Sequence, residues 1–191
     1  FNQFIKNIKE IINIKRNISF YPSAGIEIEF GTHEFKLRQR YSLSKSDFNK
    51  LDDSEINEII EKNNLKLYLD LEIPDFLIPD WLATRFWEDK ESFKINASPV
   101  LIAKNNQLIS ICYSAANFNN YSEVDILTNE EFRKKGLASI CASKYIQNIF
   151  NKGINPLWDV FVENPGSYKL AEKFGYKKVA NPYVFYRSFE M

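Results

Sequence analysis

The feature that most limits the fold is a strand, a glycine-containing bend and a long helix, which follow one another between residues 121 and 152. Residues 121–128 predict a strand, and residues 137–152 place apolar side chains at helical spacing. Gly153 is suited to ending that helix, and the apolar run at 157–162 predicts a second, buried strand. A strand, a helix and a strand in this order predict a right-handed parallel crossover.

The rest of the chain from residue 35 predicts further strands and shorter helices. Alternating or apolar runs predict strands at 35–43, 65–71, 99–104, 108–115 and 176–187. Helices are expected over 48–60, 81–93 and 166–174. Ser44 or Ser46 is the expected cap of the first of these helices, and Trp81 and Phe86 are expected to contribute to the core. Because the turn Asn105–Gln107 predicts an antiparallel hairpin, the fold class is α/β or α+β with a central mixed sheet.

The N-terminal segment differs from the rest and is interpreted as an appendage. Residues 1–16 predict an amphipathic helix, and residues 18–21 and 26–30 predict a short extended pair. The expected division is therefore an appendage at 1–32 and a main domain at 33–191.

The composition excludes several classes of protein. Hydrophobic residues make up 45% and charged residues 26% of the 191 residues, which is typical of a globular domain. Lys and Arg total 25 and Asp and Glu total 25, so a nucleic-acid partner bound through a bulk positive field is not expected. The chain contains neither an apolar run of about 18 residues nor a signal-peptide pattern, so a membrane partner is not expected either.

The metal-binding residue types are scarce. Cys112 and Cys141 fit neither a disulfide framework nor a metal site, and both are expected to be small buried residues. The single histidine, His33, lies in a turn and is expected to be an exposed loop residue. Chemistry without a metal and without a histidine base is therefore expected.

The bend Arg133-Lys134-Lys135-Gly136-Leu137-Ala138-Ser139 carries the sharpest chemical signal. The first turn of a helix leaves backbone N–H groups unpaired, and the helix dipole favours anions there, so such a turn suits a pyrophosphate. Gly136 permits a close approach to the backbone, and Ala138 keeps a second position small. A basic first turn on an ordinary helix is the alternative, and the spacing alone leaves both open. A dinucleotide-binding fingerprint is excluded, because Lys134 stands where its second glycine is required.

This bend resembles the Arg/Gln-x-x-Gly-x-Gly/Ala signature of the GNAT superfamily of acetyl-CoA-dependent N-acyltransferases. The segment Asn164–Tyr176 resembles the later Asn-x-x-Ser…Lys-x-Gly-Phe/Tyr segment of that family, and one strand at 157–162 separates the two motifs as the fold requires. More narrowly, three stretches are similar to a subgroup that includes zwittermicin-resistance acetyltransferases: 124–128, 132–138 and 156–159. The likeness is strong over 121–176 and absent over 1–32.

The resemblance implies a central mixed, mostly antiparallel sheet flanked by helices, with the strands at 121–128 and 157–162 splayed apart. It also implies acetyl-CoA as the cofactor, with its pyrophosphate on the bend and its pantetheine arm along the first of these strands. A backbone N–H near Leu127 would then polarise the thioester carbonyl. The implied cofactor-binding positions are Ile126, Leu127, Thr128, Arg133, Lys134, Lys135, Gly136, Leu137, Ala138, Ser139, Asn164 and Ser167.

Acyl transfer to an amine requires a base that accepts the proton of the amine. Asp159 lies within an apolar run, where burying a carboxylate without partners costs about 2–7 kcal/mol, so a catalytic role is favoured over a structural hydrogen bond. Glu123 lies on the strand that enters the cofactor site and is equally well interpreted as a base or as a solvated residue. Asp125 is a weaker third candidate.

The leaving thiolate of coenzyme A can be protonated by an acid on the last helix. The resemblance places a tyrosine in the last helix of many GNAT enzymes, and Ala171 stands at that position here. Tyr168 lies one turn earlier and is the candidate substitute, with simple packing as its alternative. Trp87, Tyr113 and Trp158 are expected to pack in the core, with lining of an acceptor pocket as the alternative.

The favoured function is a cytoplasmic N-acetyltransferase that moves acetyl from acetyl-CoA to a primary amine of a small molecule by direct attack in a ternary complex. One alternative is a non-catalytic acyl-CoA-binding module, and another keeps the fold but uses a different acyl donor. The expected partner is a small-molecule amine, and a homodimer is left open.

Overall fold

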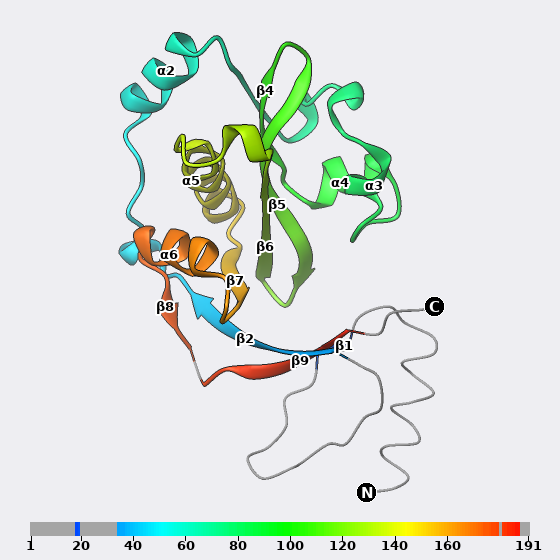
Figure 1. The fold of residues 1–191 in the computed structure, drawn as a ribbon, viewed down its shortest axis with the longest axis vertical. Helices are drawn as coiled ribbons and strands as arrows, with labels where there is room; N and C mark the ends of the chain where they lie inside the picture. The colour runs from blue at the N-terminus through cyan, green and yellow to red at the C-terminus, as the bar shows by residue number, and fades with distance from the viewer. Residues whose placement is uncertain (1–17, 20–33, 180, 188–191) are drawn as a thin grey trace, which may run out of the picture.

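The computed structural model describes residues 18–19, 34–179 and 181–187. Its described strands form a 9-stranded sheet in the order β1-β9-β2-β7-β6-β5-β4-β3, with β8 paired to β2 (Figure 1). The strands are β1 (Ile18–Ser19), β2 (Glu34–Ser42), β3 (Lys66–Leu69), β4 (Val100–Lys104), β5 (Gln107–Phe118), β6 (Tyr121–Thr128), β7 (Asn155–Phe161), β8 (Lys177–Lys178) and β9 (Tyr183–Arg187). Within the described ranges the sheet is antiparallel except where β6 meets β7, which confirms the expected mixed, mostly antiparallel architecture.

Helices cover both faces of this sheet. They are α2 (Asp53–Lys62), α3 (Asp80–Ala83), α4 (Lys90–Asn96), α5 (Leu137–Asn151) and α6 (Pro165–Lys173). Short 3-10 turns are η1 (Lys45–Asp47), η2 (Asp70–Glu72), η3 (Asp75–Leu77) and η4 (Glu130–Phe132). Figure 1 shows α5 on one side of β4, β5 and β6, and α3 and α4 on the other.

Alternation along the strands divides the core between these two faces. Cys112 and Val124 face α5 and belong to one buried cluster with Ile140 and Trp158. The neighbouring residue Tyr113 faces the other way, into a second cluster built on residues 73–97. Side chains at odd positions of β6 therefore lie on the face of α3 and α4, and even positions lie under α5.

The predicted crossover is present as β6, α5 and β7, with β6 and β7 parallel. These two strands pair only over Tyr121↔Asn155, Ser122↔Pro156 and Glu123↔Leu157. Among the described residues no pairing between them continues past Glu123, although β6 extends to Thr128. This separation is the splay that the sequence resemblance implied.

Two expectations for the segment before β4 are wrong. The predicted helix over 81–93 is broken into α3 and α4, because Asp89 takes an extended conformation and its side chain accepts from the backbone N–H of Ser92 to start a new helix. Trp81 and Phe86 do not lie in the core, since 60% and 40% of their surfaces are exposed.

The expected cap of the helix predicted over 48–60 is also wrong. Ser44 caps the short η1 turn instead, and α2 begins only at Asp53, where the Asp52 side chain accepts from the N–H groups of Ser54 and Glu55. Cys112 and Cys141 are free and buried, as predicted, and burial raises the pKa of the Cys141 thiol to about 12.

Most of the predicted appendage lies outside the described residues, as does His33. Of residues 1–32, the structure describes Ile18 and Ser19, which form β1 and pair with Tyr186 and Phe185 of β9. The division into an appendage and a main domain stays a prediction.

Gly175 gives a stability test of the connection after α6. Its φ of +91° lies in the left-handed region, and a Cβ there would collide with the backbone carbonyl of Asp47. Gly175→Ala is expected to lower the free energy of unfolding by more than about 2 kcal/mol, because it adds a clash to backbone strain. Gly153→Ala is the control: its φ is +73° with nothing within 4 Å of the added Cβ, so strain alone costs about 1–2 kcal/mol. Chemical denaturation measures both, and equal losses would contradict the clash.

Candidate active site

The bend between β6 and α5 leaves a row of backbone donors open. Lys134 and Gly136 have φ values of 60° and 79°, so the chain turns sharply before α5 begins at Leu137. The N-cap is Gly136, whose lack of a side chain leaves the first turn without a side-chain cap. Within the described part of the chain, the backbone N–H groups of residues 134–139 donate no hydrogen bond to another protein group. The arrangement suits an anion.

The register of β6 decides which of its amides face the splay. The N–H of Asn129 donates to the carbonyl of Ile109 at 2.8 Å, on the β5 side. Backbone direction alternates along a strand, so the N–H of Leu127 also faces β5, to which Leu127 is paired through Ile111. The N–H groups of Ile126 and Thr128 face the opposite way, toward the space that β7 has left. The open N–H groups near Leu127 are therefore those of its two neighbours, and the role of such a donor toward a thioester stays a prediction.

A small hollow lies beside the bend. It has a volume of about 140 Å³ and is lined by Asn63, Leu65, Lys104, Phe132, Lys135 and Leu137. A larger hollow of about 450 Å³ lies along residues 50–54. The smaller hollow adjoins the bend, but its remaining lining residues come from the segment after α2 and from β4, not from the strands that separate.

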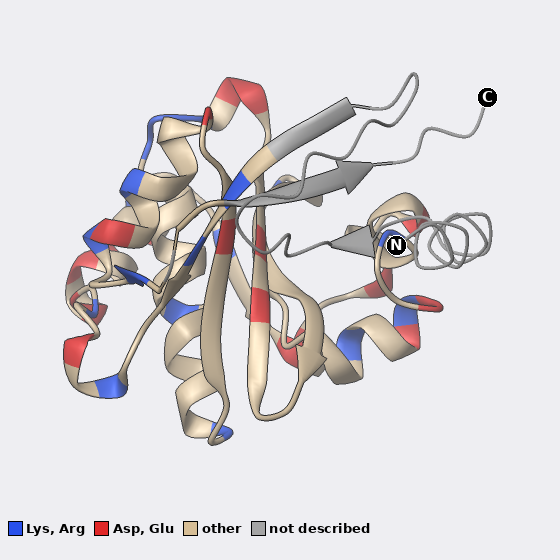
Figure 2. Cartoon of the chain, turned by 90° about the horizontal axis from the view of Figure 1, so that it is seen from below, with Lys and Arg blue, Asp and Glu red and all other residues tan. Residues whose placement is uncertain are grey.

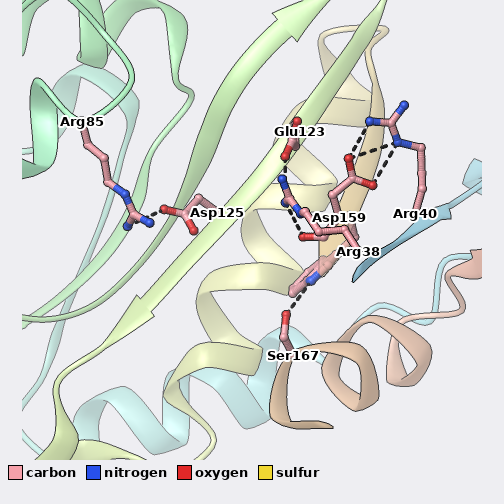
Figure 3. A network of polar contacts seen from close by, with 8 residues as sticks. Arg38, Arg40, Arg85, Glu123, Asp125, Asp159 and Ser167 are labelled. Atoms are coloured by element: carbon pink, nitrogen blue, oxygen red, sulfur yellow. Dashed lines mark hydrogen bonds and ion pairs between the residues drawn. The ribbon is translucent and has the colours of Figure 1, made fainter. Parts of the chain in front are cut away.

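Glu123 lies on the face of the sheet away from α5, at the last residue of β6 that pairs with β7. Its Oε1 accepts a hydrogen bond from Nη2 of Arg38 at 3.1 Å, and 20% of its side chain is exposed (Figure 3). Burial raises the pKa of the Glu123 carboxyl above its ordinary value, and the Arg38 charge opposes part of that rise. A half-buried glutamate of raised pKa, located where β6 and β7 begin to separate, has the properties of a general base.

Asp159 lies on β7 opposite Arg40 of β2, and only 1% of its side chain is exposed. Nε of Arg40 lies 2.9 and 3.1 Å from the two carboxylate oxygens, and Nη2 lies 2.5 Å from Oδ2. Arg40 therefore supplies the charged partner that a buried carboxylate needs, which the apolar sequence neighbours of Asp159 do not provide. Both oxygens of the carboxylate are bonded to one guanidinium, which is the geometry of the structural alternative, and a role of Asp159 as the base stays a prediction.

Asp125 lies two residues beyond Glu123 on the same face. Its Oδ2 accepts from the hydroxyl of Tyr113 at 2.6 Å and lies 3.1 Å from Nη1 of Arg85. Burial raises the pKa of the Tyr113 phenol well above its ordinary value. Tyr113 is fully buried, and Trp87 donates from Nε1 to the carbonyl of Ser114, so both serve the packing of this face, as expected.

The predicted residues of α6 have protein partners. The Asn164 side chain accepts from the N–H of Ser167 at 3.2 Å and caps the helix, and Ser167 Oγ accepts from Nε1 of Trp158 at 2.9 Å. Tyr168 is partly buried and packs against the cluster under α5, and Ala171 is fully buried. The roles of Asn164, Ser167 and Tyr168 toward a ligand stay predictions.

Three arginines that contact the acids of β6 and β7 were not predicted from the sequence. Arg38 and Arg40 of β2 contact Glu123 and Asp159, and Arg85, from the loop between α3 and α4, forms a separate pair with Asp125 (Figure 3). The available signal was the Arg-x-Arg alternation at 38–40, which places two cations on one face of a strand.

Away from this network the charges are mixed. Figure 2 shows Lys and Arg interspersed with Asp and Glu over the helices and loops. The described residues contain no group of His, Cys, Asp and Glu arranged to hold a metal ion. They also contain no helix of the length and apolar character that a membrane span needs.

The fold, the splay and the open bend coincide with a family match. The model of the GNAT acetyltransferase family matches residues 26–186. The chain belongs to the GNAT acetyltransferase family. That membership accounts for the order of strand, bend, helix and strand over 121–161, which the sequence resemblance had singled out.

Relatives and solved structures agree with the family. The chain is 33% identical over 101 residues to "Uncharacterized N-acetyltransferase YdfB" of Bacillus subtilis, a match that spans 53% of this chain and 39% of that protein. A GCN5-related N-acetyltransferase-like protein from Streptococcus suis superposes with a TM-score of 0.63 at 24% identity, over 81% of this chain and 62% of that one. A GNAT-family protein from Novosphingobium aromaticivorans gives 0.57 at 16% identity, over 82% and 66%. The structural matches show the fold, and the chain spans well under two thirds of the curated relative.

The Asp159–Arg40 pair gives a stability test of this network. Asp159→Asn is expected to lower the free energy of unfolding by about 2–3 kcal/mol, because it leaves a half-buried guanidinium without its carboxylate. Glu130→Gln is the control, since it breaks the exposed pair of Glu130 with Arg133 and is expected to cost less than about 0.5 kcal/mol. Urea denaturation compares the two; losses of the same small size would mean that Arg40 does not compensate Asp159.

Proposed function

We propose that this GNAT protein transfers an acetyl group from acetyl-CoA to a primary amine of a small molecule. The observation that carries the proposal is the splay after Glu123 and Leu157, which leaves the amides of Ile126 and Thr128 open beside a bend with further open amides. Acetyl-CoA has an amide-containing arm that can pair with a strand edge and a pyrophosphate that suits a helix N-terminus.

The proposed binding mode assigns one part of acetyl-CoA to each element. The N–H groups of residues 134–139 would hold the pyrophosphate, with the charges of Arg133, Lys134 and Lys135 nearby. The open edge of β6 at Ile126 and Thr128 would pair with the pantetheine arm, and one of these two amides would polarise the thioester carbonyl. Asn164 and Ser167 would border the arm from the start of α6.

In the proposed reaction Glu123 accepts a proton from the ammonium form of the acceptor, directly or through a water molecule. The neutral amine nitrogen then forms a bond to the thioester carbonyl carbon, and the carbon–sulfur bond breaks. As the amide forms, the nitrogen loses its second proton, which would pass to the thiolate of coenzyme A directly or through Tyr168 or water, so that the products are an acetylated amine and free coenzyme A. Asp159 holds Arg40 and so keeps β2 and β7 together under Glu123.

Several finer assignments belong to this proposal. A small-molecule acceptor accords with the mixed surface charge, and no nucleic-acid or membrane partner is proposed. A cytoplasmic location rests on the supply of acetyl-CoA, and membership of the zwittermicin-resistance subgroup rests on the sequence resemblance alone. A homodimer stays open.

Binding of acetyl-CoA is tested by thermal unfolding. At about 100 times its dissociation constant, acetyl-CoA is expected to add roughly 2.7 kcal/mol to the free energy of unfolding. Replacing Lys134 and Lys135 together by Glu is expected to weaken this stabilisation, because it reverses the charge beside the pyrophosphate. The matched control replaces Lys177 and Lys178, two adjacent exposed lysines of β8, by Glu. If acetyl-CoA stabilises neither the wild type nor the control, the binding mode is wrong.

The base is tested with Glu123→Gln, which removes the proton acceptor with little change of shape. The variant is expected to lower kcat/KM by about 10²–10⁴-fold while leaving the affinity for acetyl-CoA unchanged. The matched control is Glu163→Gln, at an exposed position after β7. In the wild type, kcat/KM is expected to fall on the acid side at a pH above the ordinary glutamate value of 4.5, since burial raises the pKa of Glu123. Undiminished turnover by Glu123→Gln across a panel of amines would exclude Glu123 as the base.

A further inference from the structure

We propose that Arg38 is a positioning residue of this site: it holds Glu123 in place and bridges β6 and β7 where the two strands separate. The inference rests on the proposed function, in which Glu123 is the base. Nothing in the family signature or in the bend refers to β2, on which Arg38 lies.

The register of β2 and β7 shows why a bridge is needed. The N–H of Val162, just after β7, donates to the carbonyl of Leu37 at 3.0 Å, so the backbone of Val162 faces β2. Because backbone direction alternates, the N–H and carbonyl of Asp159, three residues earlier, face away from β2 and toward β6. The pairing of β6 with β7 ends at Glu123, so the Asp159 carbonyl faces the space between the separated strands, with no strand directly beside it.

Arg38 supplies the missing donor. Its side chain reaches from β2 past β7, and Nη2 donates to the Asp159 carbonyl at 2.8 Å. The same nitrogen lies 3.1 Å from Oε1 of Glu123 on β6. One guanidinium nitrogen therefore joins the last paired residue of β6 to the first open carbonyl of β7, at the point where the cofactor would enter.

The packing around this guanidinium restricts its freedom. The Arg38 side chain is 16% exposed, and its guanidinium lies over the Phe161 ring at 5.4 Å from the ring centre. Phe161 is the residue that pairs with Arg38 across the two strands. A charged group held by a ring, a carbonyl and a carboxylate fixes the position of that carboxylate, which a base requires.

The charges that face Glu123 come from several elements. Burial has the largest effect on the pKa of the Glu123 carboxyl and raises it. Arg38 of β2 lowers this pKa, and Asp159 of β7 raises it. Arg40 of β2 has the smallest effect and lowers it. Asp125 lies on the same strand, and on the other face the pKa of the Tyr145 phenol of α5 is raised by burial and, to the smallest extent, by the Glu123 charge. Without Arg38 the effects of burial and of Asp159 would dominate, so Glu123 would hold its proton to higher pH.

The other two arginines of the network do not share this position. Arg40 bonds both oxygens of Asp159, and Arg85 bonds Asp125 from the loop before α4. Arg85→Gln therefore removes one positive charge from the same face of the sheet without breaking a bond to Glu123, which makes it a matched control.

The experiment measures kcat/KM against pH for the wild type, Arg38→Gln, Arg38→Lys and Arg85→Gln, with acetyl-CoA and the best amine of a panel. In Arg38→Gln the fall of kcat/KM at low pH (the acid limb of the profile) is expected to move to higher pH. At pH values above that limb, kcat/KM is expected to return to near the wild-type value. Arg38→Lys keeps the positive charge, and its acid limb is expected to lie between those of the wild type and Arg38→Gln. Arg85→Gln is expected to leave the limb where the wild type has it. A uniform loss of activity in Arg38→Gln with an unmoved limb would overturn the inference.

A second measurement does not depend on turnover. The ¹³C signal of the Glu123 carboxyl, assigned by its absence in Glu123→Gln, is titrated by NMR in the wild type and in each arginine variant. The inference predicts a higher titration midpoint in Arg38→Gln alone, and equal midpoints in all variants would overturn it. A protein that acetylates no amine but shows the predicted midpoints would contradict the proposed function and leave the role of Arg38 supported. Arg38→Lys serves as the second variant if Arg38→Gln does not fold.

Discussion

The structure depends on the early end of pairing between β6 and β7. Both strands continue beyond the Glu123↔Leu157 pair, but they separate there. Parallel strands that part leave backbone N–H and carbonyl groups facing a gap, and buried groups of this kind are costly unless something bonds them. The two sides of this gap differ: the Asp159 carbonyl of β7 accepts a hydrogen bond from Arg38, whereas the N–H groups of Ile126 and Thr128 on β6 face the gap with no strand beside them.

The same gap explains why the charged residues lie where they do. Glu123 is the last paired residue of β6, and Asp159 lies just past the last paired residue of β7. Each would be costly to bury alone, and each is bonded by an arginine from β2, the strand on the far side of β7. The two pairs are not equivalent, because Arg40 engages both oxygens of Asp159, whereas Arg38 contacts one oxygen of Glu123. The Asp159 carboxylate is thus held through both oxygens, and the Glu123 carboxylate is held through one.

Local patterns in the sequence predicted the parts of the fold that local forces decide. The stripe at 137–152 predicts α5 to within one residue at its end, and the run at 157–162 predicts β7 to within two residues, since the pattern of each is strong. The prediction of one helix over 81–93 is wrong because Asp89 caps a new helix, α4. Apolar spacing does not show this competing local signal. Asp159 was favoured as the base because its sequence neighbours are apolar. Its partner lies 119 residues away on β2, and only the strand order brings the two together.

The most direct test of the account is the response of individual backbone amides to acetyl-CoA, followed by ¹⁵N–¹H NMR. The account predicts large shifts and slowed hydrogen exchange at Ile126, Thr128 and residues 134–139, with the amide of Leu127 protected equally before and after addition because β5 already binds it. Shifts confined to other parts of the chain, or a Leu127 amide that becomes protected only with the ligand, would contradict the assignment of the gap as the site of acetyl-CoA.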